Sequence, residues 1–188
     1  SVLRLDVYKT LLMKKLLFLL VVPFVMGSAI AQELTQEETN LYNLIMQYRA
    51  EKGLPSIPLS TSLTFVAKTH AKDLDQYQPD KGNCNMHSWS NKGPWTPCCY
   101  TRDHAKAKCM WDKPKELTNY SGNGFEIAYW TSETANARGA LASWKKSAGH
   151  NSVIINKGMW RSHPWQAVGI GIYGNYAVVW FGEVKDVE

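Results

Sequence analysis

The chain has 188 residues, a formal net charge of +5, and 45% hydrophobic residues. This length and apolar content are enough for a domain with its own hydrophobic core. The positive charge is concentrated at the N-terminus, since residues 1–31 hold four basic side chains and one acidic one, which leaves 17 basic and 15 acidic residues in the remainder. Nucleic-acid binding needs a clustered excess of positive charge, so the composition excludes that class of function.

The N-terminal segment has the layout of a signal peptide. Met13 is followed by two lysines, an apolar run over residues 16–26, and small residues that end at Ala31. This order predicts a signal peptide over 13–31 that is cleaved between Ala31 and Gln32. The mature protein is therefore expected to be secreted, either to the periplasm or to the medium.

The rest of the chain is interpreted around this cleavage point. The apolar run is short for a bilayer span and contains Pro23, although a retained signal anchor is the alternative. We interpret residues 1–12 as upstream sequence or a misplaced start, and residues 32–188 as a single domain.

Cysteine usage agrees with export to an oxidising compartment. The four cysteines lie within 26 residues of one another, and this even number predicts two disulfides. A bond between adjacent cysteines is geometrically unfavourable, which leaves two connectivities open. A zinc cluster is the rival interpretation, but no Cys-x-x-Cys spacing is present. The two possible sets are Cys84–Cys98 with Cys99–Cys109, and Cys84–Cys99 with Cys98–Cys109.

Two amphipathic helices are predicted at the start of the domain. Thr35 and Glu38 form a capping box, and apolar residues then recur at helical spacing until Gly53. A second helix begins after Ser60 and ends near the polar segment 76–79. His70 lies on its apolar stripe. A histidine in that setting is predicted to be buried and hydrogen-bonded rather than a ligand.

Residues 80–123 change character and show no sustained period, so they are predicted to be an irregular, disulfide-held excursion. His104 stands among charged residues and is expected at the surface. The aromatic residues of this stretch favour a small satellite core over a ligand groove. These aromatics are Trp89, Trp95, Tyr100 and Trp111.

The last third of the domain predicts strands around one helix. Residues 125–130 have strand character, and Thr131 or Ser132 can cap a helix that runs through Trp144. Two β-rich segments, 166–173 and 176–183, are joined by a Gly-Asn pair and predict an antiparallel hairpin.

Glycines 169 and 171 alternate in the first strand of this hairpin, which indicates close approach by another element on that face. Helices early and in the middle with antiparallel strands late predict an α+β domain.

Three residues carry the chemistry that the sequence offers. His87, Glu126 and His150 each stand among small, aromatic or turn-forming neighbours. Two imidazoles and a carboxylate are suited to a polar cleft that holds a metal ion or activates water. The alternative is a structural hydrogen-bond network that only keeps the shape of the region.

The sequence motifs around these residues are similar to those of a known family. Residues 144–154, WKKSAGHNSVI, and residues 124–128, GFEIA, resemble two signatures of the CAP superfamily, which is also called the SCP domain family. That family includes cysteine-rich secretory proteins, venom antigen 5 and plant pathogenesis-related proteins, and the chain resembles its bacterial, secreted members. The resemblance covers residues 34–183 and implies an α-β-α sandwich with a central, mainly antiparallel sheet.

The resemblance also implies a ligand-binding cleft. His87 and His150 match the two cleft histidines and Glu126 matches the first acid, whereas Ser147 stands where the animal proteins have the second acid. Neutral imidazoles are good ligands for zinc or another divalent cation. We therefore predict His87 and His150 as metal ligands, with Glu126 orienting a histidine or a bound water.

Two classes of function follow. The first is a non-enzymatic, monomeric binding module for a small apolar or lipid-like molecule, a glycan, or a secreted or cell-surface protein. It is preferred because no convincing nucleophile is present. The second is a metal-assisted peptidase in which Glu126 acts as general base.

Overall fold

The computed structural model describes residues 33–187. The signal peptide predicted over 13–31 and the segment 1–12 lie outside the described residues. Within 33–187, no helix is both long enough and apolar enough to cross a membrane.

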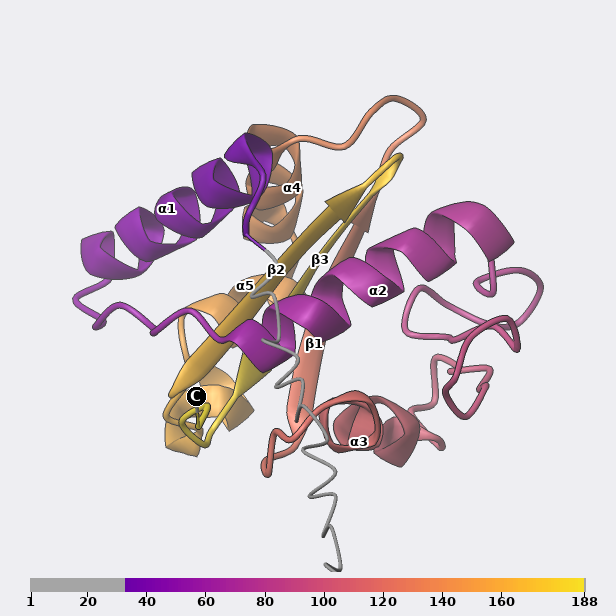
Figure 1. The fold of residues 1–188 in the computed structure, drawn as a ribbon. Coiled ribbons are helices and arrows are strands. Elements are labelled where there is room, and N and C mark those ends of the chain that lie inside the picture. The colour runs from indigo at the N-terminus through magenta and orange to yellow at the C-terminus, as the bar shows by residue number, and fades with distance from the viewer. Residues whose placement is uncertain (1–32, 188) are drawn as a thin grey trace, which may run out of the picture. The chain divides into compact units, whose positions relative to one another are not determined.

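The described residues form helices on both faces of a three-stranded sheet (Figure 1). The strands are antiparallel and lie in the order β1-β3-β2, so β1 is an edge strand. In chain order the elements are α1 (Gln36–Glu51), α2 (Thr61–Tyr77), α3 (Ala107–Leu117), β1 (Gly124–Trp130), α4 (Ala137–Lys146), α5 (Ala148–Ile154), the 3-10 helix η1 (Gly158–Ser162), β2 (Ala167–Tyr173) and β3 (Tyr176–Gly182).

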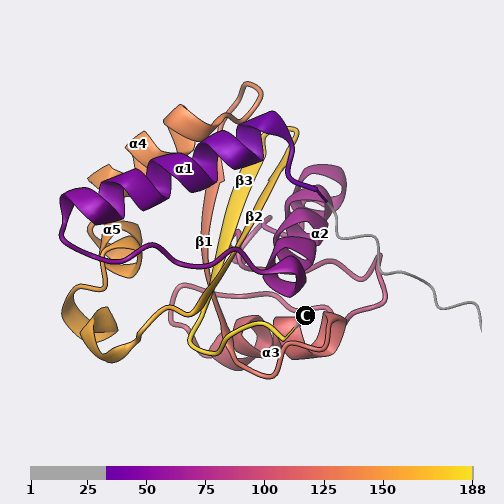
Figure 2. The same cartoon turned by 60° about the vertical axis from the view of Figure 1, so that its left-hand side comes forward.

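The sheet separates two hydrophobic cores. Helices α1, α4 and α5 pack on one face, while α2 crosses the other face with α3 at the foot of β1 (Figures 1 and 2). Phe125 and Ile127 enter the first core, and Ala128 enters the second. Because strand side chains alternate between faces, Glu126 is directed to the face that α2 covers. The predicted α+β, α-β-α sandwich is therefore confirmed.

The two N-terminal helices begin where the sequence predicts. The Thr35 hydroxyl accepts a hydrogen bond from Glu38 N at 3.2 Å, and the Glu38 carboxylate accepts from Thr35 N at 2.7 Å. At α2, the Ser60 hydroxyl accepts from Leu63 N at 2.9 Å. Asp186 then accepts from Ser62 N at 2.8 Å, so the C-terminal segment adds a second cap to α2.

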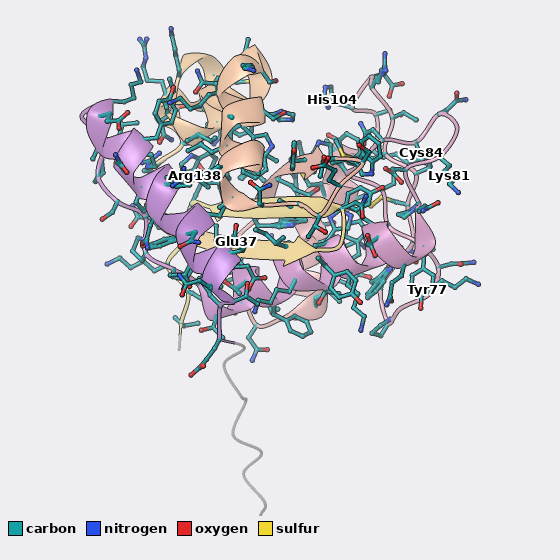
Figure 3. The ribbon with its side chains drawn as sticks, turned by 90° about the horizontal axis from the view of Figure 1, so that it is seen from above. Glu37, Tyr77, Lys81, Cys84, His104 and Arg138 are labelled. Atoms are coloured by element: carbon teal, nitrogen blue, oxygen red, sulfur yellow. A yellow bond between two sulfur atoms is a disulfide. The ribbon has the colours of Figure 1, made fainter. Side chains whose placement is uncertain are left out.

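The N-terminal end of α4 is hydrogen-bonded to α1, on which α4 packs. Glu37 accepts a hydrogen bond from the backbone N–H of Ala137 at 3.0 Å, which joins the start of α4 to the first turn of α1. Figure 3 labels Glu37 on α1 and Arg138 on α4 at this contact. The cap of α4 is Asn136, whose side chain accepts from Gly139 N at 2.9 Å.

The prediction that Thr131 or Ser132 caps this helix was therefore wrong. Residues 131–135 instead continue away from β1, and the N–H groups of Thr131 and Ala135 donate to the β2–β3 turn at Asn175 and Gly174. These long-range hydrogen bonds decide where α4 begins.

The interval 80–123 is not irregular throughout, because it contains α3. The local sequence does not predict α3, because Pro114 lies inside the helix and no side chain caps its first turn. Burial of Met110, Lys113 and Pro114 stabilises this helix, whose local helix propensity is low.

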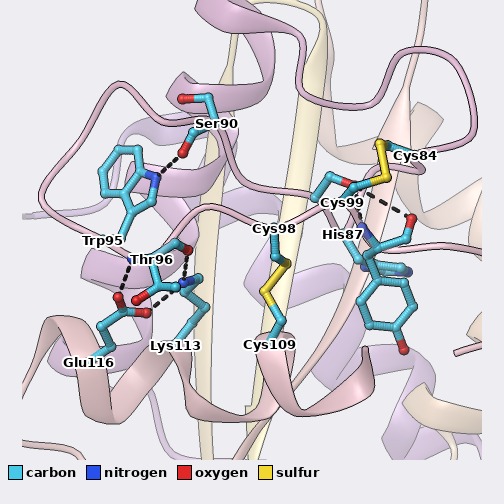
Figure 4. The surroundings of a disulfide bond; sticks show 12 residues. Cys84, His87, Ser90, Trp95, Thr96, Cys98, Cys99, Cys109, Lys113 and Glu116 are labelled. Carbon is cyan, nitrogen blue, oxygen red and sulfur yellow. Dashed lines mark hydrogen bonds and ion pairs between the residues drawn. A yellow bond between two sulfur atoms is a disulfide. The ribbon is translucent and has the colours of Figure 1, made fainter. Parts of the chain in front are cut away.

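Two disulfides hold this excursion, as predicted, with the connectivity Cys84–Cys99 and Cys98–Cys109 (Figure 4). Cys98 also pairs through its backbone with Trp89, at 2.9 and 3.1 Å. Trp89 and Tyr100 are buried in the second core, whereas Trp111 is 39% exposed. The two buried rings are core residues, but they belong to the second main core with α2 and the sheet rather than to the separate satellite core that was predicted.

The predicted hairpin is confirmed, and so is the predicted close approach of another element to its first strand. β2 and β3 pair through a two-residue turn in which Gly174 has φ of +53°. A Cβ at Gly169 would overlap the backbone of Leu63, and one at Gly171 would overlap the backbone of Ala67. Helix α2 therefore lies directly on the β2 backbone.

Candidate functional site

Glu126 is the centre of the candidate site because it holds two histidines from different segments. Its side chain is fully buried beneath α2. The ring Nδ1 of His70 on α2 contacts Oε1, and Nδ1 of His87 in the excursion contacts Oε2 at 2.7 Å. Both carboxylate oxygens are therefore engaged by imidazoles.

The hydrogen-bond partners of His70 indicate that its ring is doubly protonated. Its Nε2 lies 2.9 Å from the backbone oxygen of Ser88, and a carbonyl can only accept. Its Nδ1 faces the Glu126 carboxylate, which also accepts when ionised. A ring with an acceptor at each nitrogen is an imidazolium, so His70 and Glu126 form a fully buried ion pair.

Each charge of the His70–Glu126 pair stabilises the other and offsets the cost of its burial. Burial lowers the pKa of His70, but the negative charge of Glu126 and the hydrogen bonds to Glu126 and Ser88 outweigh it, and the pKa is raised. Burial likewise raises the pKa of Glu126, but the charge and hydrogen bonds of His70 and His87 outweigh it, and the pKa is lowered. The carboxylate is thus ionised at neutral pH.

Aromatic rings hold both histidines in place. His70 stacks on Trp89 with ring centroids 4.1 Å apart and planes within 6° of each other. His87 meets Tyr100 edge to face at 5.3 Å. The backbone N–H of Tyr100 donates to the Ser88 hydroxyl at 2.8 Å, which ties this ring to the segment that carries His87.

His87 is the partly accessible member of the group. Its side chain is 17% exposed, and its backbone N–H donates to the Asn85 side chain at 3.0 Å. Because Glu126 accepts from Nδ1, a neutral His87 ring carries its proton there and presents an Nε2 lone pair. Figure 4 shows His87 beside the disulfide of Cys84 and Cys99.

His150 lies in the first turn of α5, where the charges of His87 and Glu126 both act on it. Burial and the charge of His87 lower its pKa, and the opposing charge of Glu126 is the weaker influence. The lowered pKa favours the neutral form of His150 at neutral pH. The Ser147 hydroxyl, at the position of the second acid in the animal proteins, accepts from His150 N at 3.5 Å as the cap of α5.

The remaining histidine candidate stands at the edge of this group. His104 has φ of +58°, and its Nδ1 lies 3.0 Å from the Tyr100 hydroxyl. It makes no contact with Glu126. Within 33–187, no group of three or more His, Cys, Asp or Glu side chains is arranged to hold a metal ion.

His70 is the site residue that sequence reasoning placed in a purely structural role. It is buried and hydrogen-bonded as predicted, but its partner is the carboxylate of the candidate site. The available signal was an ionisable ring on an apolar stripe, since a buried ionisable group needs a charged or polar partner. Nothing local identifies that partner, which lies 56 residues away.

The buried pair predicts a pH dependence of stability. The raised pKa of His70 means that its contribution to the free energy of unfolding is complete below about pH 6.5 and is lost as pH rises through the folded-state pKa. Glu126 acts oppositely, because its lowered pKa gives a contribution that is lost as pH falls below about 4.5.

We expect urea unfolding of the parent protein to show stability declining as pH rises above 6.5. In His70→Gln this decline should be absent, because the group that titrates has been removed. An equal decline in both proteins would show that His70 is not charged in the folded state.

The fold and this site define an α-β-α domain with a histidine–carboxylate group at the sheet edge. The family model for the cysteine-rich secretory protein family, CAP, matches residues 42–175. The chain therefore belongs to this family, as its resemblance to the CAP signatures predicts. No relative with curated annotation matches the sequence.

Three solved structures share the fold at low sequence identity. An outer surface protein of Borrelia burgdorferi is 17% identical with a TM-score of 0.54, and the match covers 82% of this chain and 97% of that one. An extracellular SCP-domain protein of Bacillus anthracis is 17% identical with a TM-score of 0.52, covering 80% of this chain and 44% of that one. A cysteine-rich secretory protein of Staphylococcus aureus is 15% identical with a TM-score of 0.50, covering 81% and 40% respectively.

Proposed function

We propose that this protein is an exported, non-enzymatic binding module whose site is formed by His87, Glu126 and His150. Export is supported by the signal peptide predicted over 13–31 and by the two disulfides. It also agrees with the descriptions of two structural neighbours as an outer surface protein and an extracellular protein.

The observation that carries the proposal is the placement of Glu126. A fully buried carboxylate that accepts from His87 Nδ1 orients that ring and raises the basicity of its other nitrogen. Burial lowers the pKa of His150, which favours its neutral, metal-binding form. Two imidazoles that have given up their extra proton can supply nitrogen donors to zinc or another divalent cation.

Such a cation site would be open. With two protein nitrogens, the other positions are left to water or to donor atoms of a bound molecule, and the affinity is expected to be modest. The ligand classes that fit this role are a small apolar or lipid-like molecule, a glycan, or a secreted or cell-surface protein. The protein is expected to act as a monomer.

The peptidase alternative has no observation in its favour. A general base must reach the water that it activates. Glu126 has a fully buried side chain, and each of its oxygens already faces an imidazole nitrogen. We therefore assign it an orienting role.

Zinc titration by calorimetry tests the proposal. The oxidised protein should bind zinc saturably at one site, and the double variant His87→Ala/His150→Ala should lose this binding. Glu126→Gln should weaken it by about tenfold or more, because the ring of His87 loses its charged partner.

His163→Ala is the matched control for this titration. His163 also pairs with a carboxylate, Glu183, at 2.9 Å, but it lies outside the site. Zinc binding should be unchanged in this variant. Equal binding by the parent and by the double variant would contradict the proposed cation site and leave the three residues as a structural network.

A further inference from the structure

A hollow of about 560 Å³ lies between the C-terminal end of α2 and the disulfide-held excursion. Its volume is within the range of small-molecule pockets, roughly 300–1,000 Å³. Tyr77, Pro79, Trp89 and Pro97 supply its apolar lining, and Lys92 and Lys106 supply charge. Figure 3 shows Tyr77 on the side of the molecule that also carries Cys84. None of His87, Glu126 and His150 lines this hollow.

The walls of the hollow are held rigid by contacts made elsewhere. Trp89 is 2% exposed, stacks on His70, and meets Trp95 edge to face at 5.1 Å. Cys98 and Cys99 also line the hollow, and each is in a disulfide (Figure 4). A wall that is already ordered lowers the entropic cost of binding.

The charge of the lining is one-sided. It contains two exposed lysines, Lys92 and Lys106, and no acidic residue. Neither lysine forms an ion pair with another residue of the described part of the chain. In the same excursion, Lys108 pairs with Asp112 and Lys113 pairs with Glu116. The hollow thus keeps two uncompensated positive charges beside an aromatic wall.

We propose that this hollow binds a small organic anion with a flat apolar body. The body would lie against Tyr77, whose ring is 48% exposed, and against the prolines, with the acidic group between Lys92 and Lys106. This site does not depend on the proposed cation site, because the two share no lining residue.

A second hollow, of about 420 Å³ between α1 and α4, serves as the internal comparison. It also combines apolar residues with cations, namely Leu44, Leu141 and Ala142 with Arg138, Lys145 and Lys146. Lys145 is already placed over the ring of Tyr48, with Nζ 4.2 Å from the centroid. Its charge is therefore partly engaged, unlike that of Lys92 and Lys106.

Two fluorescent probes of the same shape test the proposal. 8-Anilinonaphthalene-1-sulfonate carries one negative charge, and N-phenyl-1-naphthylamine is its uncharged analogue. We expect the oxidised protein to bind the sulfonate at one saturable site. Lys92→Gln/Lys106→Gln should weaken that binding about five- to tenfold and leave the neutral probe unaffected. Tyr77→Ser should weaken both probes.

Lys145→Gln/Lys146→Gln is the matched control, and it should leave sulfonate binding unchanged. Circular dichroism and melting temperature would establish that all variants are folded. Loss of binding in this control with retention in Lys92→Gln/Lys106→Gln, or sulfonate binding that does not saturate, would overturn the proposal. Sulfonate binding should persist in His87→Ala/His150→Ala, so a failure here is distinguishable from failure of the cation site.

Discussion

Replacing Glu126 by alanine should destabilise the folded protein by about 3–5 kcal/mol, the usual cost of removing one partner of a buried ion pair. The substitution leaves the fully buried His70 ring without the carboxylate that supports its charge. It also removes the acceptor of the His87 ring. The free energy of unfolding at pH 7, from urea titration of parent and variant, measures the effect.

Glu126→Gln separates the charge from the shape of this side chain. A neutral His70 can accept from the glutamine amide at Nδ1 while Nε2 still donates to the Ser88 carbonyl, and the glutamine oxygen can accept from His87. The cost should therefore be smaller, about 1–2 kcal/mol. Equal losses for alanine and glutamine would show that the hydrogen bonds contribute nothing beyond the ion pair, and no loss for alanine would contradict the buried pair altogether.

The second large effect is expected at Gly169, where a methyl group has no space. Gly169→Ala places Cβ against the carbonyl of Leu63 and the nitrogen of Thr64, which are backbone atoms of α2. Backbone cannot move aside as a flexible side chain can, so the helix would have to lift from β2. We expect a loss of at least about 3 kcal/mol, at the upper end of overpacking costs.

Gly149→Ala is the control for Gly169→Ala. Gly149 lies in α5, has no positive φ, and a Cβ there meets nothing within 4 Å. Alanine should be neutral or stabilise the protein by up to about 1 kcal/mol, because it is the better helix former. Thermal unfolding of both variants measures the contrast. Similar melting temperatures would show that α2 does not rest on the β2 backbone as described.

Elements with complete local signals were predictable from sequence. Helix α1 begins at the predicted capping box, α2 begins after Ser60, and the β2–β3 hairpin turns at Gly174. Helix α3 was missed because Pro114 and an uncapped start conceal it, and its stability comes from burial of Met110 and Lys113. The predicted cap of α4 was wrong because residues 131–135 form hydrogen bonds to the β2–β3 turn, and the helix begins only after Asn136.

The candidate site was also only partly predictable from the sequence. Glu126 and His150 could be recognised because each stands in a short signature of the family, and His87 because it matches the position of the first cleft histidine. The contact between His70 and Glu126 has no such motif, since it depends on α2 crossing the sheet above β1. Which cysteines pair was likewise open, because adjacent Cys98 and Cys99 are equivalent by spacing.

The sequence by itself determined the α+β class, the caps of α1 and α2, the hairpin, the even cysteine count and the family motifs, because most of these signals depend on side chains a few residues apart. Only the tertiary structure decided that Glu126 holds His70 and His87 together, that burial lowers the pKa of His150, and that Lys92 and Lys106 face a hollow without acidic partners. These features arise where segments far apart in the chain meet, and burial at those contacts sets which groups are charged.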